Sequence, residues 1–193
     1  MPNRRPDPSE HAPYYGKYIS LVPGDDPVAA LQENLRTTSE LLESIGEEQS
    51  NESYAPGKWS MKQLLGHLND AERIFSYRAT RISRGDETPL PGFEQEDYIK
   101  NFPFESLRWA DLVAEYKAIR QSTLALLTQL PKAAWERRGT ASDASVSVLA
   151  VAYIMAGHEL HHVKILRERY LGKTTAAWAS TELPQLRELR RKN

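Results

Sequence analysis

Residues 146–172 of the chain read VSVLAVAYIMAGHELHHVKILRERYLG and contain three of its five histidines. At about 100° per residue, His158 and His162 fall on the same stripe of an α-helix as several large apolar side chains. Residues four apart lie on neighbouring turns of one helix face. Two imidazoles at this spacing can bind one metal ion, whereas a metal-free core would have to supply a hydrogen-bond partner for each ring. This stretch therefore predicts a long helix that carries candidate metal ligands into the core.

Other residues of the same stretch allow more than one interpretation. A single histidine on an apolar face is more often a hydrogen-bonded core residue than a metal ligand, and only the second imidazole in register shifts that balance. His161 lies on the flank of the stripe, where it is either solvated or in contact with the ligand side chains. Arg169 extends the stripe by two turns, either as an anion-binding charge or as a charge that reaches out of the core.

The composition limits the class of protein. With 193 residues, of which 40% are hydrophobic and 26% charged, we expect one globular domain with a substantial core. The formal net charge of −1 provides no overall basic surface for nucleic acid. No apolar run approaches the roughly 20 residues that cross a bilayer, and the first residues lack an apolar signal core, so we expect a cytoplasmic protein without a membrane partner. Since the chain has no cysteine, any metal must be bound by His, Asp or Glu.

Hydrophobic periodicity and helix-boundary residues predict an all-α fold. Asp26 before Pro27 and Ser60 before an apolar stripe are typical helix starts, and Pro131 ends another helical pattern. We find no strand alternation, and we expect the polar segment 131–145 to form turns. The predicted fold is a four-helix bundle whose helices span residues 27–46, 60–84, 107–130 and 146–172.

Both ends of the chain extend beyond the predicted bundle core, residues 27–172. The N-terminal arm, residues 1–24, is rich in proline and tyrosine, and we expect it to be extended with its aromatic side chains packed on the body. The C-terminal extension, residues 173–193, contains Trp178 and a short helical pattern at 183–189. We expect this extension to dock on the outside of the bundle or on a second subunit.

The segment from Gly85 to Pro103 is too long for a simple connection between helices. Loops of this length usually cover a site or a partner surface. Phe93, Tyr98 and Phe102 could bury part of a small ligand there. We therefore predict that this loop borders the open side of the metal site; packing on a dimer partner is the alternative.

The second predicted helix adds a third histidine on an apolar stripe. His67 shares this stripe with Arg78, three turns further on. Together with His158 and His162, it would complete a site with three imidazole ligands. Structural zinc sites are normally closed by four protein ligands, while catalytic sites keep three and leave one coordination position open. The count therefore favours chemistry, with zinc, nickel, copper or iron as the metal.

Two stretches, KWSMKQLLGHLNDAERIFSYR (58–78) and GHELHHVKILRERYLG (157–172), resemble the DinB-like four-helix bundles that include bacillithiol and mycothiol S-transferases. The resemblance covers most of residues 27–172. It implies one divalent metal, nickel or zinc, bound by one histidine of the second helix and a His-x-x-x-His pair of the fourth, which here are His67, His158 and His162. It also implies a homodimer and a metal that activates the thiol of a low-molecular-weight cofactor for reaction with a small-molecule substrate.

The roles of two arginines in such a reaction stay open. Arg78 and Arg169 could attract a carboxylate of the thiol cofactor, and ion pairing within the bundle is the equal alternative. Arg78 is also a weak candidate for a catalytic role.

Residues 158–162 also match a different motif. His158-Glu159-Leu160-His161-His162 matches H-E-x-x-H, the zinc-protease signature in which Glu159 would be the general base. The longer metzincin signature fails, Glu182 lies beyond the glycine that ends the helix, and His67 would have no role. A third interpretation is a bundle that binds metal or a partner, for example in a stress response, without catalysis. We consider the thiol S-transferase first, the non-catalytic bundle second and the protease last.

Overall fold

The computed structural model describes residues 3–172, and helices account for most of them. The segments predicted beyond Gly172, including Trp178, Glu182 and the pattern at 183–189, lie outside the described residues. Short 3₁₀ helices occur at Pro8–Glu10, Pro13–Tyr15 and Phe104–Ser106, and a π-helical turn at Leu166–Tyr170. The α-helices and strands are α1 (Gly16–Ile19), α2 (Pro27–Glu43), α3 (Glu47–Ser50), α4 (Met61–Ser83), α5 (Gln95–Asn101), α6 (Trp109–Thr128), α7 (Lys132–Trp135), β1 (Arg138–Ala141), β2 (Ala144–Ser147) and α8 (Val148–Ile165).

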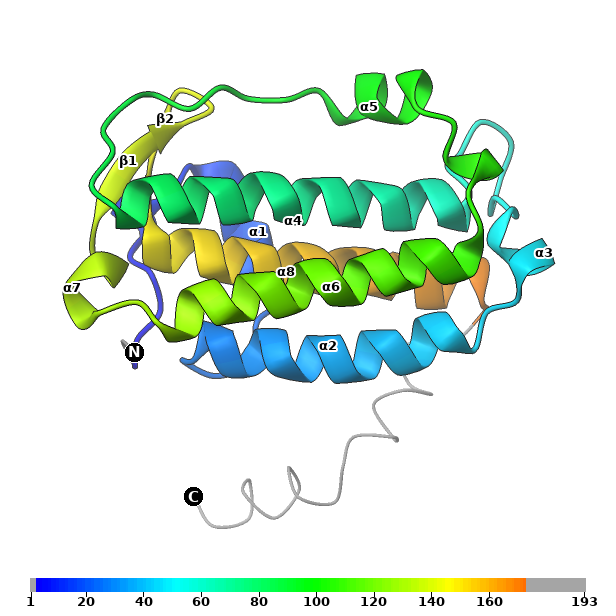
Figure 1. The fold of residues 1–193 in the computed structure, drawn as a ribbon, viewed down its shortest axis with the longest axis horizontal. Coiled ribbons are helices and arrows are strands. Elements are labelled where there is room, and N and C mark those ends of the chain that lie inside the picture. The colour runs from blue at the N-terminus through cyan, green and yellow to red at the C-terminus, as the bar shows by residue number, and fades with distance from the viewer. Residues whose placement is uncertain (1–2, 173–193) are drawn as a thin grey trace, which may run out of the picture.

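The four long helices α2, α4, α6 and α8 form a four-helix bundle, as the sequence predicts (Figure 1). Each of α4 and α2 packs against both α6 and α8. The predicted helix starts are also confirmed. The Asp26 side chain accepts hydrogen bonds from the first turn of α2, and Ser60 and Gln63 form a reciprocal capping box at α4. Ser147, which was not predicted, caps α8.

The long segment 85–103 is explained by the direction of the helices. In Figure 1, α4 and α6 run the same way along the bundle, so the chain must travel back along its length between them. Helix α5 lies on this return path and packs against α4. The length of the segment is therefore a requirement of the topology, independent of any role at a site.

One local prediction was wrong, because the segment expected to be only turns contains an antiparallel hairpin. Strands β1 and β2 pair from Arg138 opposite Ser147 to Ala141 opposite Ala144. The two turn residues, Ser142 and Asp143, both have positive φ angles. Such a tight turn matches the natural twist of paired strands. These strands are only four residues long, which is too short for an alternating pattern to be visible in the sequence.

The N-terminal arm is not simply extended, because it contains two 3₁₀ helices and α1, and α1 packs against α8. The contact is very close at Gly157, where an added Cβ atom would lie 2.0 Å from the carbonyl oxygen of Tyr18. Only glycine allows the arm to approach α8 at this point. Residue 157 immediately precedes His158, so the arm is fixed beside the candidate metal ligands.

Apolar side chains form two separate core clusters within the bundle. One contains Ala71, Phe75 and the first half of α8, and the other contains Met61, Leu65 and the last turns of α8. Buried polar residues occupy the intervening stretch of α4 and α8. A polar layer thus crosses the middle of the bundle, and it holds the three candidate ligands. Among the described helices, none is long and apolar enough to cross a membrane.

Candidate metal centre

The structure brings His67, His158 and His162 together, as the sequence analysis expects. One ring nitrogen from each of the three imidazoles lies within 4.8 Å of the others. The Nε2 atoms of His67 and His158 are 3.1 Å apart. The ring centroids of His162 lie 4.9 Å from His67 and 4.6 Å from His158. Within the described chain, these residues form the only group of three or more potential ligands with this spacing.

Burial keeps the three imidazoles in the form that binds metal. It lowers the pKa of His67 to about 4. For His158 and His162, burial lowers the pKa well below its ordinary value, and the neighbouring histidines and Lys17 lower it further. A neutral imidazole keeps a lone pair on one nitrogen, which is what coordination requires. The site is therefore poised to accept a cation at neutral pH.

The donor set fits a divalent transition metal. A tetrahedral ion with metal–nitrogen bonds of about 2.0–2.1 Å separates two ligand nitrogens by roughly 3.3 Å. The observed 3.1 Å between His67 and His158 is close to that separation. Without an ion, one of these two nitrogens must donate a proton to the other. The three residues can thus hold one metal ion with small side-chain adjustments, and they leave a coordination position for another ligand.

Aromatic side chains from the N-terminal arm and from the segment before α4 pack against the cluster. His67 and His158 are buried, whereas His162 is partly exposed. The Tyr18 ring packs edge-on against His158, with centroids 5.3 Å apart, and the Trp59 ring lies 5.2 Å from that of His67. Both aromatic rings come from outside the long helices. The sequence gives no signal for either contact, because helical periodicity does not extend into these segments.

Lys17 brings a positive charge to the same side. Its ammonium group lies 3.8 Å from the ring centroid of Tyr14 and 4.8 Å from that of Tyr18. The hydroxyl groups of these two tyrosines are 3.1 Å apart. No carboxylate in the described chain forms an ion pair with any of the three ligand imidazoles. An ion bound there would keep most of its positive charge, so the environment favours an anionic additional ligand.

His161 lies on the flank, as expected. Its ring packs against those of Tyr18 and His162, with centroids 5.3 and 5.1 Å apart. It does not belong to the group of convergent ligand atoms. Burial lowers its pKa, and the nearby charges of Lys17 and Lys164 add to this effect. His161 therefore supports the ligand ring of His162 without reaching the metal position.

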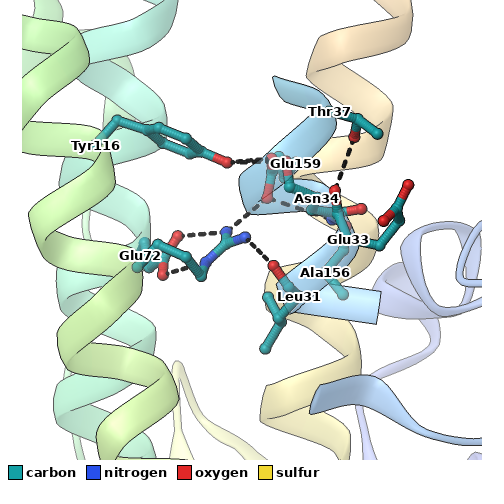
Figure 2. A network of polar contacts seen from close by, with 9 residues as sticks. Leu31, Glu33, Asn34, Thr37, Glu72, Tyr116, Ala156 and Glu159 are labelled. Atoms are coloured by element: carbon teal, nitrogen blue, oxygen red, sulfur yellow. Dashed lines mark hydrogen bonds and ion pairs between the residues drawn. The ribbon is translucent and has the colours of Figure 1, made fainter. Parts of the chain in front are cut away.

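Glu159 belongs to a buried ion cluster that is separate from the imidazoles (Figure 2). Its Oε1 accepts a hydrogen bond of 2.6 Å from the hydroxyl of Tyr116, and its Oε2 accepts one of 2.5 Å from Arg120. Asn34 donates a third bond to Oε2, at 3.3 Å. A general base needs a free lone pair close to the reacting water. This carboxylate is instead held by three donors from α2 and α6, so it links α8 to two other helices of the bundle.

Arg120 is the centre of this ion cluster. Its guanidinium is fully buried and also donates two hydrogen bonds, of 2.7 and 2.6 Å, to the carboxylate of Glu72. Burial by itself lowers the pKa of Arg120, but the charges of Glu159 and Glu72 outweigh it and hold this pKa well above its ordinary value. Burial and the charge of Glu159 raise the pKa of Tyr116 in turn. This cluster was not predicted from the sequence, although Arg120 is a charged residue on the apolar stripe of α6, and that is a signal of a buried ion pair.

A small cavity separates the ion cluster from the imidazoles. It has a volume of about 10 Å³ and is lined by residues that include His158, Glu159 and Arg120. This is about the space that one water molecule needs, and it is too small for a substrate.

The two candidate anion-binding arginines lie in different surroundings. Arg78 is buried on α4, and its Nη2 donates hydrogen bonds to the carbonyl of Pro91 and the hydroxyl of Ser142. Arg169 is exposed on the π-helical turn that follows α8. The extra residue in a π turn shifts the register, so the stripe expected from a regular helix does not continue to Arg169.

The aromatic side chains of the 85–103 loop pack mainly on other aromatic residues. Phe93 contacts Tyr98, and Phe102 contacts Phe104, with ring centroids 5.4 and 4.7 Å apart. Among the described ring contacts, none joins these loop residues to an imidazole of the cluster. The loop approaches the site through Glu96, which accepts a 3.3 Å hydrogen bond from the indole of Trp59.

Three solved structures have folds similar to that of this chain, and one of them is described as a probable metal-dependent hydrolase. YfiT from Bacillus subtilis, described as a probable metal-dependent hydrolase with an unusual four-helix bundle topology, aligns with a TM-score of 0.66 and 17% identity over 90% of this chain and 97% of its own. A DinB-like protein of Bacillus subtilis, YjoA, aligns with a TM-score of 0.56 and 23% identity over 77% and 93%. The mycothiol-dependent maleylpyruvate isomerase aligns with a TM-score of 0.60 and 15% identity, over 71% of this chain and 58% of its own.

Sequence comparison identifies the family of the chain. The protein named "Putative metal-dependent hydrolase OB0413" from Oceanobacillus iheyensis is 24% identical over 130 residues, which are 64% of this chain and 72% of the relative. The family model of the DinB superfamily matches residues 30–166, a range that includes most of the bundle and all three histidines. The chain belongs to the DinB superfamily.

Proposed function

We propose that the protein is a divalent-metal-dependent enzyme that transfers a low-molecular-weight thiol onto small electrophilic molecules. The observation that carries this proposal is the convergence of three neutral imidazoles on one open position, beside a cation and away from any free carboxylate. Nickel and zinc are the metals that we expect, because imidazole is a suitable ligand for both. A bound ion of this kind supplies acidification of a thiol or water at its open position, and so creates a nucleophile at neutral pH.

The residues of the chain supply position and charge for this reaction. His67, His158 and His162 hold the metal position, and the rings of Tyr18 and Trp59 limit access of water to it. Lys17 favours the approach of an anion. In the transfer, the sulfur forms a bond to an electrophilic carbon, the bond from that carbon to its leaving group breaks, and the thiol proton is released to solvent.

Hydrolysis of a small molecule is the second candidate. It is favoured by the names of two similar proteins, each called a metal-dependent hydrolase. The position of Glu159 argues against the protease form of this activity, because its carboxylate is held by Tyr116 and Arg120. Hydrolysis would then depend on metal-acidified water without a protein general base. A bundle that binds metal without catalysis is the third possibility.

A pair of assays distinguishes these functions. Protein loaded with nickel or zinc is incubated with bacillithiol or cysteine and a chlorodinitrobenzene, and both thiol loss and chloride release are measured. The same protein is incubated with a nitrophenyl ester in the absence of thiol. Thiol loss that requires metal supports the transferase, and ester cleavage that requires metal supports the hydrolase. Metal binding with neither reaction would contradict both enzyme proposals.

Two further properties remain proposals that rest on the family resemblance. We propose a homodimer, with small molecules as the other partners, and a cytoplasmic location. Size-exclusion chromatography with light scattering tests the dimer directly. A monomer at about micromolar concentration would contradict it.

A further inference from the structure

Arg78 is a buried arginine without a carboxylate partner in the part of the chain that the structure describes. The residue is only 4% exposed. Its Nη2 donates hydrogen bonds to the carbonyl of Pro91, at 2.8 Å, and to the Ser142 hydroxyl, at 2.9 Å, and both acceptors are neutral. No ion pair within residues 3–172 includes it. Burial of a guanidinium without a counter-charge is unfavourable, so an anion from outside the described chain is the expected partner.

A recess beside Arg78 gives such an anion a place. The recess has a volume of about 10 Å³, so it admits one carboxylate oxygen, and the rest of a ligand must extend from it past the lining side chains. A guanidinium carries five N–H donors in a planar fork, and the two hydrogen bonds described above both use Nη2. Donors therefore remain for a ligand at the recess. Its walls are mostly apolar and include Tyr15, Phe75, Ser145, Val151 and Ile154.

The recess adjoins the metal centre through Phe75. The guanidinium carbon of Arg78 lies 5.8 Å from the centroid of the Phe75 ring, and the same centroid lies 5.9 Å from that of His158. Arg78 and His67 share one face of α4, three turns apart. Phe75 also lines the small cavity beside His158, so rotation of this one side chain would let a single small molecule place one end at Arg78 and the other at the imidazoles.

We infer that Arg78 binds the carboxylate of a small molecule whose reacting group is held at the imidazole cluster. This inference rests on the proposed function and adds a substrate class to it, namely small carboxylic acids. Carboxylates match the guanidinium fork with two parallel charge-assisted hydrogen bonds, which a neutral ligand cannot form. The carboxylate belongs either to the thiol or to the electrophile, and the experiments below separate these two sources.

The first experiment measures anion binding in metal-free protein, so it does not depend on the metal or on catalysis. Propionate and its neutral analogue propionamide are titrated into the full chain, and the Nε–H signals of the arginines are followed by NMR. We expect a saturable shift of the Arg78 signal with propionate and none with propionamide. Equal shifts with both ligands, or no saturable shift, would overturn the inference.

Matched arginine variants control this titration. Arg78→Gln assigns the signal and should weaken propionate binding by about tenfold or more, because the charge is lost while a side-chain amide remains. Arg73→Gln removes an exposed arginine of the same helix that pairs with Glu115, and binding should not change. Equal weakening in both variants would indicate a general charge effect and contradict the inference. If Arg78→Gln does not fold, Arg78→Lys assigns the signal instead, because it keeps the charge and removes the arginine Nε–H, and the wild-type titration then decides.

The second experiment identifies which reactant carries the carboxylate. Cysteine and cysteamine differ only in a carboxylate, and so do a chloronitrobenzoate and its uncharged parent chloronitrobenzene. With metal-loaded protein, Arg78→Gln should raise KM about tenfold for the carboxylate-bearing member of one pair, with kcat and the neutral member little changed. An unchanged preference in both pairs would overturn the assignment to the active site. Absence of any thiol reaction would refute the proposed function alone, since the metal-free titration is independent of it.

Discussion

Two polar clusters lie side by side in the middle of the bundle. Two consecutive residues of α8, His158 and Glu159, each belong to one of them. His158 points to two other imidazoles that have the same chemistry and no counter-charge. Glu159 points to Arg120, whose donors are all directed at carboxylates or a carbonyl. The ion cluster satisfies its own hydrogen bonds and therefore needs no ligand. The imidazole cluster has no such set of partners, and this difference supports a structural role for the ion cluster and our proposal that the imidazoles bind a ligand.

Removal of one imidazole should have the largest effect. Protein loaded with nickel or zinc should retain about one ion per chain, and His67→Ala should weaken metal binding by about 100-fold or more, because two imidazoles cannot complete the site. Metal analysis after dialysis, without a His tag, measures this. His161→Ala is the matched control and should lose less than about tenfold. Full metal occupancy in His67→Ala would contradict the proposed difference between the two clusters, since the metal ligands would have to be assigned differently.

Removal of the central charge of the other cluster should affect stability and not metal binding. Arg120→Met leaves the carboxylates of Glu72 and Glu159 buried without a cation, and we expect a loss of about 3–5 kcal/mol in the free energy of unfolding. Urea unfolding measures it. Replacement of all three residues by apolar side chains of similar size should recover most of the loss. A loss below about 1 kcal/mol in the single variant would show that water reaches this cluster.

The stability of metal-free protein should fall as the pH falls through the range in which histidine titrates. The folded-state pKa of His67 is lowered to about 4, so below the unfolded value of 6.5 the unfolded state binds more protons than the folded state. The contribution of His67 to the free energy of unfolding is thus fully present above about pH 6.5. It is lost as the pH falls toward 4 and amounts to roughly 3 kcal/mol. Urea unfolding across this range, with a chelator present, gives the slope. His67→Gln should show a shallower slope, and an equal slope would exclude His67 as its source.

The smallest effect is expected from Glu159→Gln. The amide oxygen can still accept a hydrogen bond from Tyr116, and Arg120 keeps its pair with Glu72, so we expect a loss of about 1–2 kcal/mol in the free energy of unfolding. Metal content should be unchanged, and thiol-dependent activity should change only modestly. The wild type should not cleave peptides. Peptide cleavage that this substitution abolished would make Glu159 a general base and reverse the contrast between the two clusters.

Much of the bundle and the cluster of three candidate ligands could be predicted from the sequence, for a physical reason. Long helices repeat their pattern over several turns, so His67, His158 and His162 each appear in register with a core stripe. The β-hairpin offers only four residues per strand, and its turn depends on the positive φ angles of Ser142 and Asp143. No comparable repetition exists there, and the hairpin was missed.

Contacts between side chains of different elements could not be predicted from the sequence either. The approach of Lys17 and Tyr18 to the imidazoles depends on how the arm folds back over Gly157. The pairing of Arg120 with Glu72 and Glu159 depends on which helices become neighbours in the bundle. A periodic pattern tells which face of a helix is buried, but it does not tell which face of another helix lies opposite.

The shared direction of α4 and α6 has a consequence for the kinetics of folding (Figure 1). Among the described long helices, α4 and α6 are the only pair consecutive in sequence that packs extensively, and α2 packs against α6 and α8, which both follow much later in the chain. The side chain of Asn34 reaches the carbonyl of Ala156 across 122 residues of chain. Closing so long a loop costs chain entropy before native contacts offset it, and a helical protein built in this way has the contact order, and the slower folding, of a more complex topology.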